Sequence, residues 1–92
     1  MHIPDGARPM TRRLLASFLE YAVKGMVTWE EVRRFMNASY EDDVMARAVA
    51  EFRDLIPYQS WVSGRGTVAN QLFPTEAAER AYAIAKELRE AP

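Results

Sequence analysis

A helix–turn–helix pattern between residues 25 and 56 constrains this sequence more than any other feature. Thr28 is followed three residues later by Glu31, which is the spacing of a capping box at a helix start. The polar turn Asn37–Ser39 ends this first helix and caps a longer one that runs to Ile56. The chain is therefore expected to fold around two consecutive helices joined by a tight turn.

Apolar side chains recur at three- and four-residue steps on both sides of that turn and in one segment before it. This spacing places them on one face of a helix. It predicts helices over residues 11–24, 29–36 and 40–56, the last of which is ended by Pro57. The side chains expected in the core are Leu14, Phe18, Val32, Phe35, Val49, Phe52 and Trp61.

A last helix is expected over residues 75–90, with Thr75 as its N-cap. Its apolar side is rich in alanine, and small side chains let helices approach closely. That side packs either on the first helix of the same chain or on a second copy of the chain, and we expect a homodimer. The residues expected at the dimer interface are Ala77, Ala81, Tyr82, Ile84 and Leu88.

The stretch after Pro57, YQSWVSGRGTVANQLF, alternates like two strands joined by a tip at Ser63–Thr67. Such alternation, interrupted by glycines, is typical of a β-hairpin. Residues 25–27 can add a short third strand. The predicted fold class is therefore α+β, with four helices and a wing of two or three strands.

The 92 residues suffice for one domain with one modest core. Residues 1–10, with Pro4, Gly6 and Pro9, are expected to form a flexible arm, and residues 11–90 the domain. The chain has no cysteine, so disulfides and thiolate metal sites are excluded, which fits a reducing cytoplasm. No segment has the apolar run of a signal peptide or of a membrane span. We expect a soluble cytoplasmic protein.

The charges of the chain are unevenly distributed. The formal net charge is −1, so the chain as a whole lacks the basic footprint of a nucleic-acid-binding protein. Residues 1–38 carry six basic and four acidic side chains, whereas residues 39–56 carry two basic and five acidic ones. The most acidic segment is thus the helix that follows the turn.

The predicted order of helix, short strand, helix, turn, helix, hairpin and final helix resembles the winged-helix regulators of bacteria and archaea. Examples are those related to the multiple-antibiotic-resistance and phenolic-acid-response repressors. Residues 27–32, VTWEEV, are similar to the start of their second helix, and residues 72–76 to the point where their wing meets the next helix. The resemblance covers residues 11–90. It implies a homodimer on palindromic DNA, with the third helix in the major groove and the wing against the minor groove or the backbone.

Carried over onto this sequence, the resemblance places DNA contacts in the third helix and in the wing. These contacts are Ser39, Tyr40, Asp43, Arg47, Arg65 and Thr67. The basic residues Arg8, Arg12 and Arg33 are expected to add phosphate contacts. Asp43 stands four residues before Arg47, so the two are placed to form a helical ion pair.

Two functions follow from this pattern and remain open alternatives. The first is a DNA-binding transcriptional regulator, which rests on the winged-helix resemblance and on the basic arm. The second is a protein–protein interaction module without DNA binding, such as a subunit of an assembly or a small viral or mobile-element inhibitor. The acidic segment 39–56 suits a basic partner surface better than it suits phosphates.

An enzyme is not expected. The single histidine is His2, in the terminal arm, where a catalytic base is not held in position. The sequence has no cysteine nucleophile and no glycine-rich phosphate loop. The adjacent carboxylates Glu41–Asp43 point in different directions on a helix, so they suit a helix start better than a metal site. Neither a metal nor another cofactor is expected.

Overall fold

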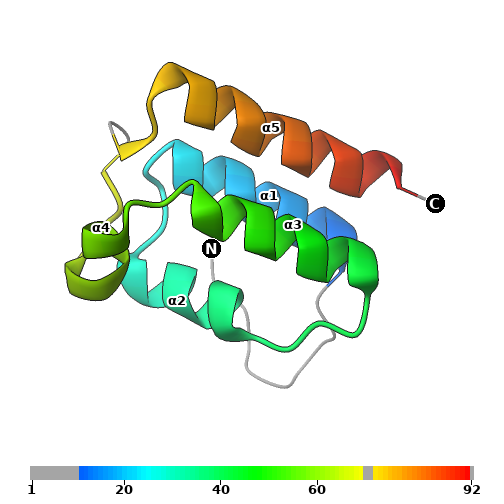
Figure 1. Cartoon of the computed structure of the whole chain (residues 1–92), viewed down its shortest axis with the longest axis horizontal. Helices are drawn as coiled ribbons and strands as arrows, with labels where there is room; N and C mark the ends of the chain where they lie inside the picture. Colours follow the sequence, from blue (N-terminus) through cyan, green and yellow to red (C-terminus); the bar gives the residue numbers. More distant parts are fainter. Residues whose placement is uncertain (1–10, 70–71, 92) are drawn as a thin grey trace.

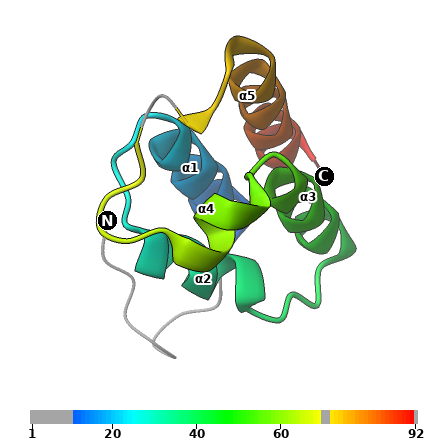
Figure 2. The ribbon, with the colours of Figure 1, turned by 60° about the vertical axis from the view of Figure 1, so that its left-hand side comes forward.

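The computed structural model describes residues 11–69 and 72–91, which form five helices. They are α1 (Arg12–Val23), α2 (Trp29–Asn37), α3 (Asp43–Asp54), α4 (Tyr58–Ser63) and α5 (Thr75–Glu90). Helix α1 packs against both α5 and α3, and α3 also contacts α2 and α5 (Figure 1). The short helix α4 lies beside α2 and the end of α3 (Figure 2). None of the described helices is long and apolar enough to cross a membrane.

Side-chain caps determine where the first three helices begin. Thr11 caps α1, and its hydroxyl accepts a hydrogen bond from the Leu14 N–H at 3.0 Å. The predicted capping box at α2 is confirmed, because the Glu31 N–H bonds to Thr28 and the Glu31 carboxylate bonds to the Thr28 N–H. Helix α3 begins at Asp43, three residues later than predicted, because the Asp42 side chain caps it. Ser39 and Tyr40 therefore lie in the turn and not in the helix.

The core consists of apolar side chains from every helix except α4, together with Val27, Ile56, Val68 and Phe73 from the connecting segments. Phe18 of α1 stacks on Phe35 of α2 with ring centroids 3.7 Å apart. Phe52 of α3 packs on Phe73, which precedes α5, at 5.6 Å. Of the predicted core, Phe18, Val32, Phe35, Val49 and Phe52 are buried, whereas Leu14 and Trp61 are only partly buried.

The predicted α+β fold with a β-wing is wrong. Residues 58–63 form helix α4 instead of a strand, with hydrogen bonds from Trp61 N–H to Pro57 O and from Gly64 N–H to Ser60 O. In the described part of the chain, β pairing is limited to one antiparallel bridge between Thr28 and Thr67. The described residues are thus all-helical in character, with five helices in place of the predicted four.

The failure of the wing prediction has a local physical reason. Alternation over only six residues does not distinguish a strand from a short helix. Pro57 has a φ of −57°, which suits a helix start, so the chain turns directly from α3 into α4. The third strand expected over residues 25–27 does not form either. The backbone pairing there is reduced to two hydrogen bonds, from Val68 N–H to Val27 O and from Trp29 N–H to Gly66 O, both at 2.8 Å.

We predict that Phe52→Ala lowers the free energy of unfolding by about 3–5 kcal/mol, because it removes a fully buried aromatic ring from the core. Tyr58→Ala is the matched control, since that side chain is 74% exposed on α4 and its loss is expected to cost about 0.5 kcal/mol or less. Urea denaturation of both variants measures the difference. Equal midpoints for the two variants would show that Phe52 does not lie in the core.

Candidate functional site

Arg12, a predicted phosphate contact, is engaged in an ion pair within the fold. Its guanidinium makes a bidentate pair of hydrogen bonds to the Asp42 carboxylate, with an Nε–Oδ2 distance of 2.7 Å and an Nη2–Oδ1 distance of 3.2 Å. The same carboxylate accepts hydrogen bonds from the N–H groups of Val44 and Met45 at the start of α3. The Arg12 hydrogen bond, helped by these two N–H groups, holds the pKa of Asp42 below its ordinary value. Arg8, the other expected contact in the arm, lies outside the described residues.

Arg33 holds helix α4 in place. It donates hydrogen bonds to the carbonyl oxygens of Trp61 at 3.1 Å and Gly64 at 2.8 Å, where a cation satisfies the carbonyl end of a helix. Its guanidinium carbon also lies 5.9 Å from the centre of the Trp29 ring. Arg53 of α3 lies 4.9 Å over the ring of Trp61. We call this set of contacts the clasp, because it attaches α4 to α2 and α3. Its residues are Trp29, Arg33, Arg53, Trp61 and Gly64.

Four of the other described cations are also engaged within the chain. Arg34 pairs with Glu30 on α2 at 3.6 Å. Arg80 of α5 bonds to Glu51 of α3. The remaining contacts are those of Arg80 with Glu87, of Arg89 with Glu20 and Ser17, and of Arg65 with the carbonyl oxygens of Ser63 and Gly64. Among the described residues, the cationic side chains that make no ion pair, hydrogen bond or ring contact are those of Arg13, Lys24, Arg47 and Lys86, which lie on different elements.

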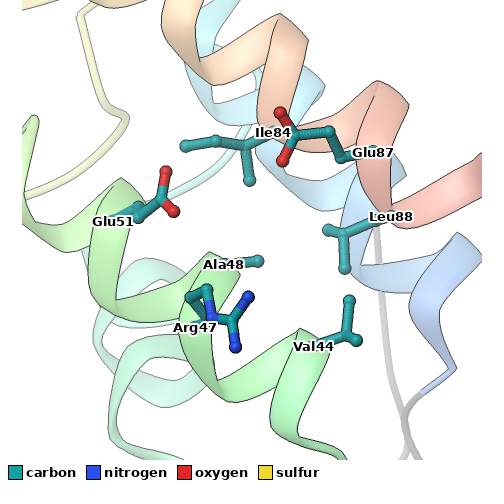
Figure 3. Close-up of a pocket in the computed structure, with 7 residues that line it drawn as sticks. All are labelled: Val44, Arg47, Ala48, Glu51, Ile84, Glu87 and Leu88. Carbon is teal, nitrogen blue, oxygen red and sulfur yellow. The ribbon is translucent and has the colours of Figure 1, made fainter. Parts of the chain in front are cut away.

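Arg47 lies on the side of α3 that faces α5. Figure 3 shows it beside a notch with Val44, Ala48, Glu51, Ile84, Glu87 and Leu88. Although both residues are described, the expected ion pair between Asp43 and Arg47 is not formed. The notch has a volume of ≈ 60 Å³, which is room for about two water molecules and too little for a nucleotide base or a cofactor.

The predicted DNA-contact residues do not gather on one surface. Arg12, Ser39 and Tyr40 line a groove of ≈ 550 Å³ with Thr11, Glu41, Asp42 and Met45, between the start of α1 and the turn before α3. Arg65 and Thr67 are exposed beyond α4, beside the start of α2. Arg47 borders the notch toward α5. The structure therefore distributes these residues over three separate places.

The apolar side of α5 is covered within a single chain. Ala81, Ile84 and Leu88 are buried in the core, and Ala77 is partly buried. Tyr82 is the exposed member of the expected dimer interface, with 39% of its surface accessible. The homodimer stays a prediction, and its contact on α5 would have to use Tyr82 and the neighbouring polar surface.

A groove between α2 and α3 is the surface that the sequence interpretation missed. It has a volume of ≈ 490 Å³ and is lined by Met36, Ala38, Tyr40, Ala46, Val49, Ala50, Arg53 and Asp54. Met36 and Val49 are buried at its floor, and Ala46 and Ala50 are exposed on α3. The sequence carried a signal for this groove, since these two alanines stand one helical turn apart in the third helix.

Tyr40 forms a wall between the two grooves. Its hydroxyl donates a hydrogen bond to the carbonyl oxygen of Phe35 at 2.6 Å. Burial raises the pKa of Tyr40 to about 12. The hydroxyl is therefore held neutral and is already used within the fold, so it is a wall of the groove and not a free polar group.

Within the described residues, no group of three or more histidine, cysteine, aspartate or glutamate side chains is arranged to hold a metal ion. In comparisons with known proteins, no family model matches the sequence, and no curated protein or solved structure shows a significant similarity to it. The function must therefore be argued from the grooves and the charges.

We predict that Arg33→Met lowers the free energy of unfolding by about 1–3 kcal/mol, because it removes the charged donor of the Trp61 carbonyl oxygen and one of the two charged donors of the Gly64 carbonyl oxygen. The tryptophan fluorescence of the folded variant should also change, since Arg33 contacts both Trp29 and Trp61. Arg47→Met is the matched control, with an expected change within about 0.5 kcal/mol. If both variants unfold at the same urea concentration, the clasp does not stabilise α4.

We predict that one tyrosine ionises about two pH units later than the ordinary value of 10.0, and that Tyr40→Phe removes this late step. Because the folded-state pKa is raised, the stability that Tyr40 contributes is complete below pH 10 and is lost as the pH rises toward 12. Absorbance at the tyrosinate band measures the titration. Tyr58→Phe, at an exposed position, should keep the late step. A late step that persists in Tyr40→Phe would contradict this assignment.

Proposed function

We propose that this protein is a protein-interaction domain that binds a partner protein through the groove between α2 and α3. The groove itself is the observation that carries the proposal. It combines a buried apolar floor, at Met36 and Val49, with two exposed alanines and a charged rim. An apolar centre surrounded by a polar rim is the usual anatomy of a protein–protein interface.

The distribution of cations favours a protein over DNA as the partner. Binding to duplex DNA draws its strength from lysine and arginine side chains that gather on one surface and neutralise phosphates. Here Arg12, Arg33 and Arg53 are engaged within the fold. The unpaired cations lie on different elements, and segment 39–56 carries two basic side chains against five acidic ones.

The carboxylates of α3 that make no ion pair indicate the charge of the partner surface. Arg53 lies over the Trp61 ring, whereas Asp54 at the groove rim makes no ion pair within the described chain. Asp43, at the start of α3, is likewise unpaired and exposed. A partner surface with apolar anchors and neighbouring lysine or arginine side chains is complementary to this face.

The test is site-specific photo-cross-linking in the cell that naturally produces the protein. A photoreactive residue replaces Ala50 in the groove, and the control carries it at Glu79, an exposed position near the start of α5. We expect a discrete protein adduct from position 50 that is absent from position 79. Adducts of equal yield from both positions, or none from either, would contradict the proposed surface.

A gel-shift titration on a random-sequence duplex separates the DNA hypothesis from this proposal. At about 50 mM salt, where phosphate contacts are strong, we expect no shift. A shift that weakens steeply with salt and is reduced by Arg47→Ala or Arg65→Ala would favour DNA binding over the proposed function.

A further inference from the structure

We propose that the segment of the partner that occupies the α2–α3 groove is an amphipathic helix with a cationic residue near each end of its apolar stripe. This inference rests on the proposed function, because it concerns the same groove. It specifies the secondary structure of the bound segment and the spacing of its charges.

The backbone of the described chain favours a helix over a strand. An added strand needs an exposed sheet edge with unpaired N–H and C=O groups. Over the described residues, β pairing is limited to the bridge between Thr28 and Thr67, which lies outside the groove lining. One wall of the groove is helix α3, whose backbone groups are bonded within the helix, and the other is formed by Met36 in the last turn of α2 with Ala38 and Tyr40 of the turn that follows.

The α3 wall suits a third helix. Ala46 and Ala50 are exposed there and stand about 6 Å apart along the helix axis, which is one turn. Side-chain size at the contact sets the distance between packed helices, so two alanines allow a close approach. The apolar side chains of the arriving helix then reach the floor at Met36 and Val49.

A small polar ligand suits this groove poorly. Sites for small molecules usually place a few polar groups so that they converge on the ligand. Here the Tyr40 hydroxyl bonds to the Phe35 carbonyl oxygen, and the Arg53 guanidinium lies over the Trp61 ring. In the groove of ≈ 490 Å³ these two polar side chains are therefore engaged within the fold, and Asp54 at the rim is the other charged lining side chain, which makes no ion pair in the described chain.

The unpaired carboxylates on α3 give the spacing of the cations. Asp43 and Asp54 are exposed on the same ridge of the helix, since eleven residues bring the chain back to nearly the same direction, and the exposed Arg47 stands between them on that side. They stand about 16 Å apart along the axis. A partner helix that runs along α3 meets both if it carries lysine or arginine about eleven residues apart.

The test uses the full chain and two labelled peptides of about 18 residues with identical apolar stripes. One carries lysine at two positions eleven residues apart, and the other carries glutamate at the same positions. Each exposed ion pair is worth about two- to fivefold in affinity, so we expect the lysine peptide to bind about four- to twentyfold more tightly by fluorescence anisotropy. The double variant Asp43→Lys/Asp54→Lys should reverse this preference.

Two further variants serve as controls. Glu76→Lys/Glu79→Lys makes the same charge change at the start of α5 and should leave the preference unchanged. Ala50→Gln adds neutral bulk to the groove wall and should weaken both peptides alike.

The outcomes separate this inference from the proposed function. If neither peptide binds while the photoreactive residue at position 50 still cross-links to a partner protein, the helix inference is overturned and the interaction domain stands. Equal binding of the two peptides to the parent chain would overturn the assignment of Asp43 and Asp54. If neither peptide binds and the photoreactive residue at position 50 gives no adduct, both the helix inference and the proposed function are overturned.

Discussion

The hydrogen bonds of Asp42 determine the geometry of the proposed binding face. One carboxylate caps α3 through the N–H groups of Val44 and Met45 and pairs with Arg12 at the start of α1. It therefore fixes both the residue at which α3 begins and the position of that end against α1. Because the helical phase follows from the first residue, this cap places Ala46 and Ala50 toward α2 and Arg47 toward α5.

Local features of the fold were predictable from the sequence, whereas the helical conformation of residues 58–63 was not. The capping box at Thr28 and the apolar stripes through Phe18, Phe35 and Phe52 depend on residues a few positions apart, so the sequence alone reveals them. The conformation of residues 58–63 depends on Arg33, which lies 28 residues before its partner Trp61. No spacing rule reveals such a contact, and the short alternation fits a strand as well as a helix.

The candidate site shows the same division between local and long-range information. An arginine in a sequence looks available, but Arg12 and Arg33 have partners 30 and 28 residues away that occupy them. The acidity of α3 was apparent from composition, and so was its mismatch with phosphate. The groove needed the packing of α2 on α3, which brings Met36 and Val49 together beneath the two alanines.

The packing of α1 on α5 also has a consequence for biosynthesis. Glu20 and Arg89, which pair across these two helices, are separated by 69 residues in the chain. At a synthesis rate of about 5–20 residues per second, the ribosome needs on the order of several seconds to make the segment between them. During that interval the side of α1 that packs against α5 lacks its cover, so the nascent chain exposes apolar surface that the complete chain buries.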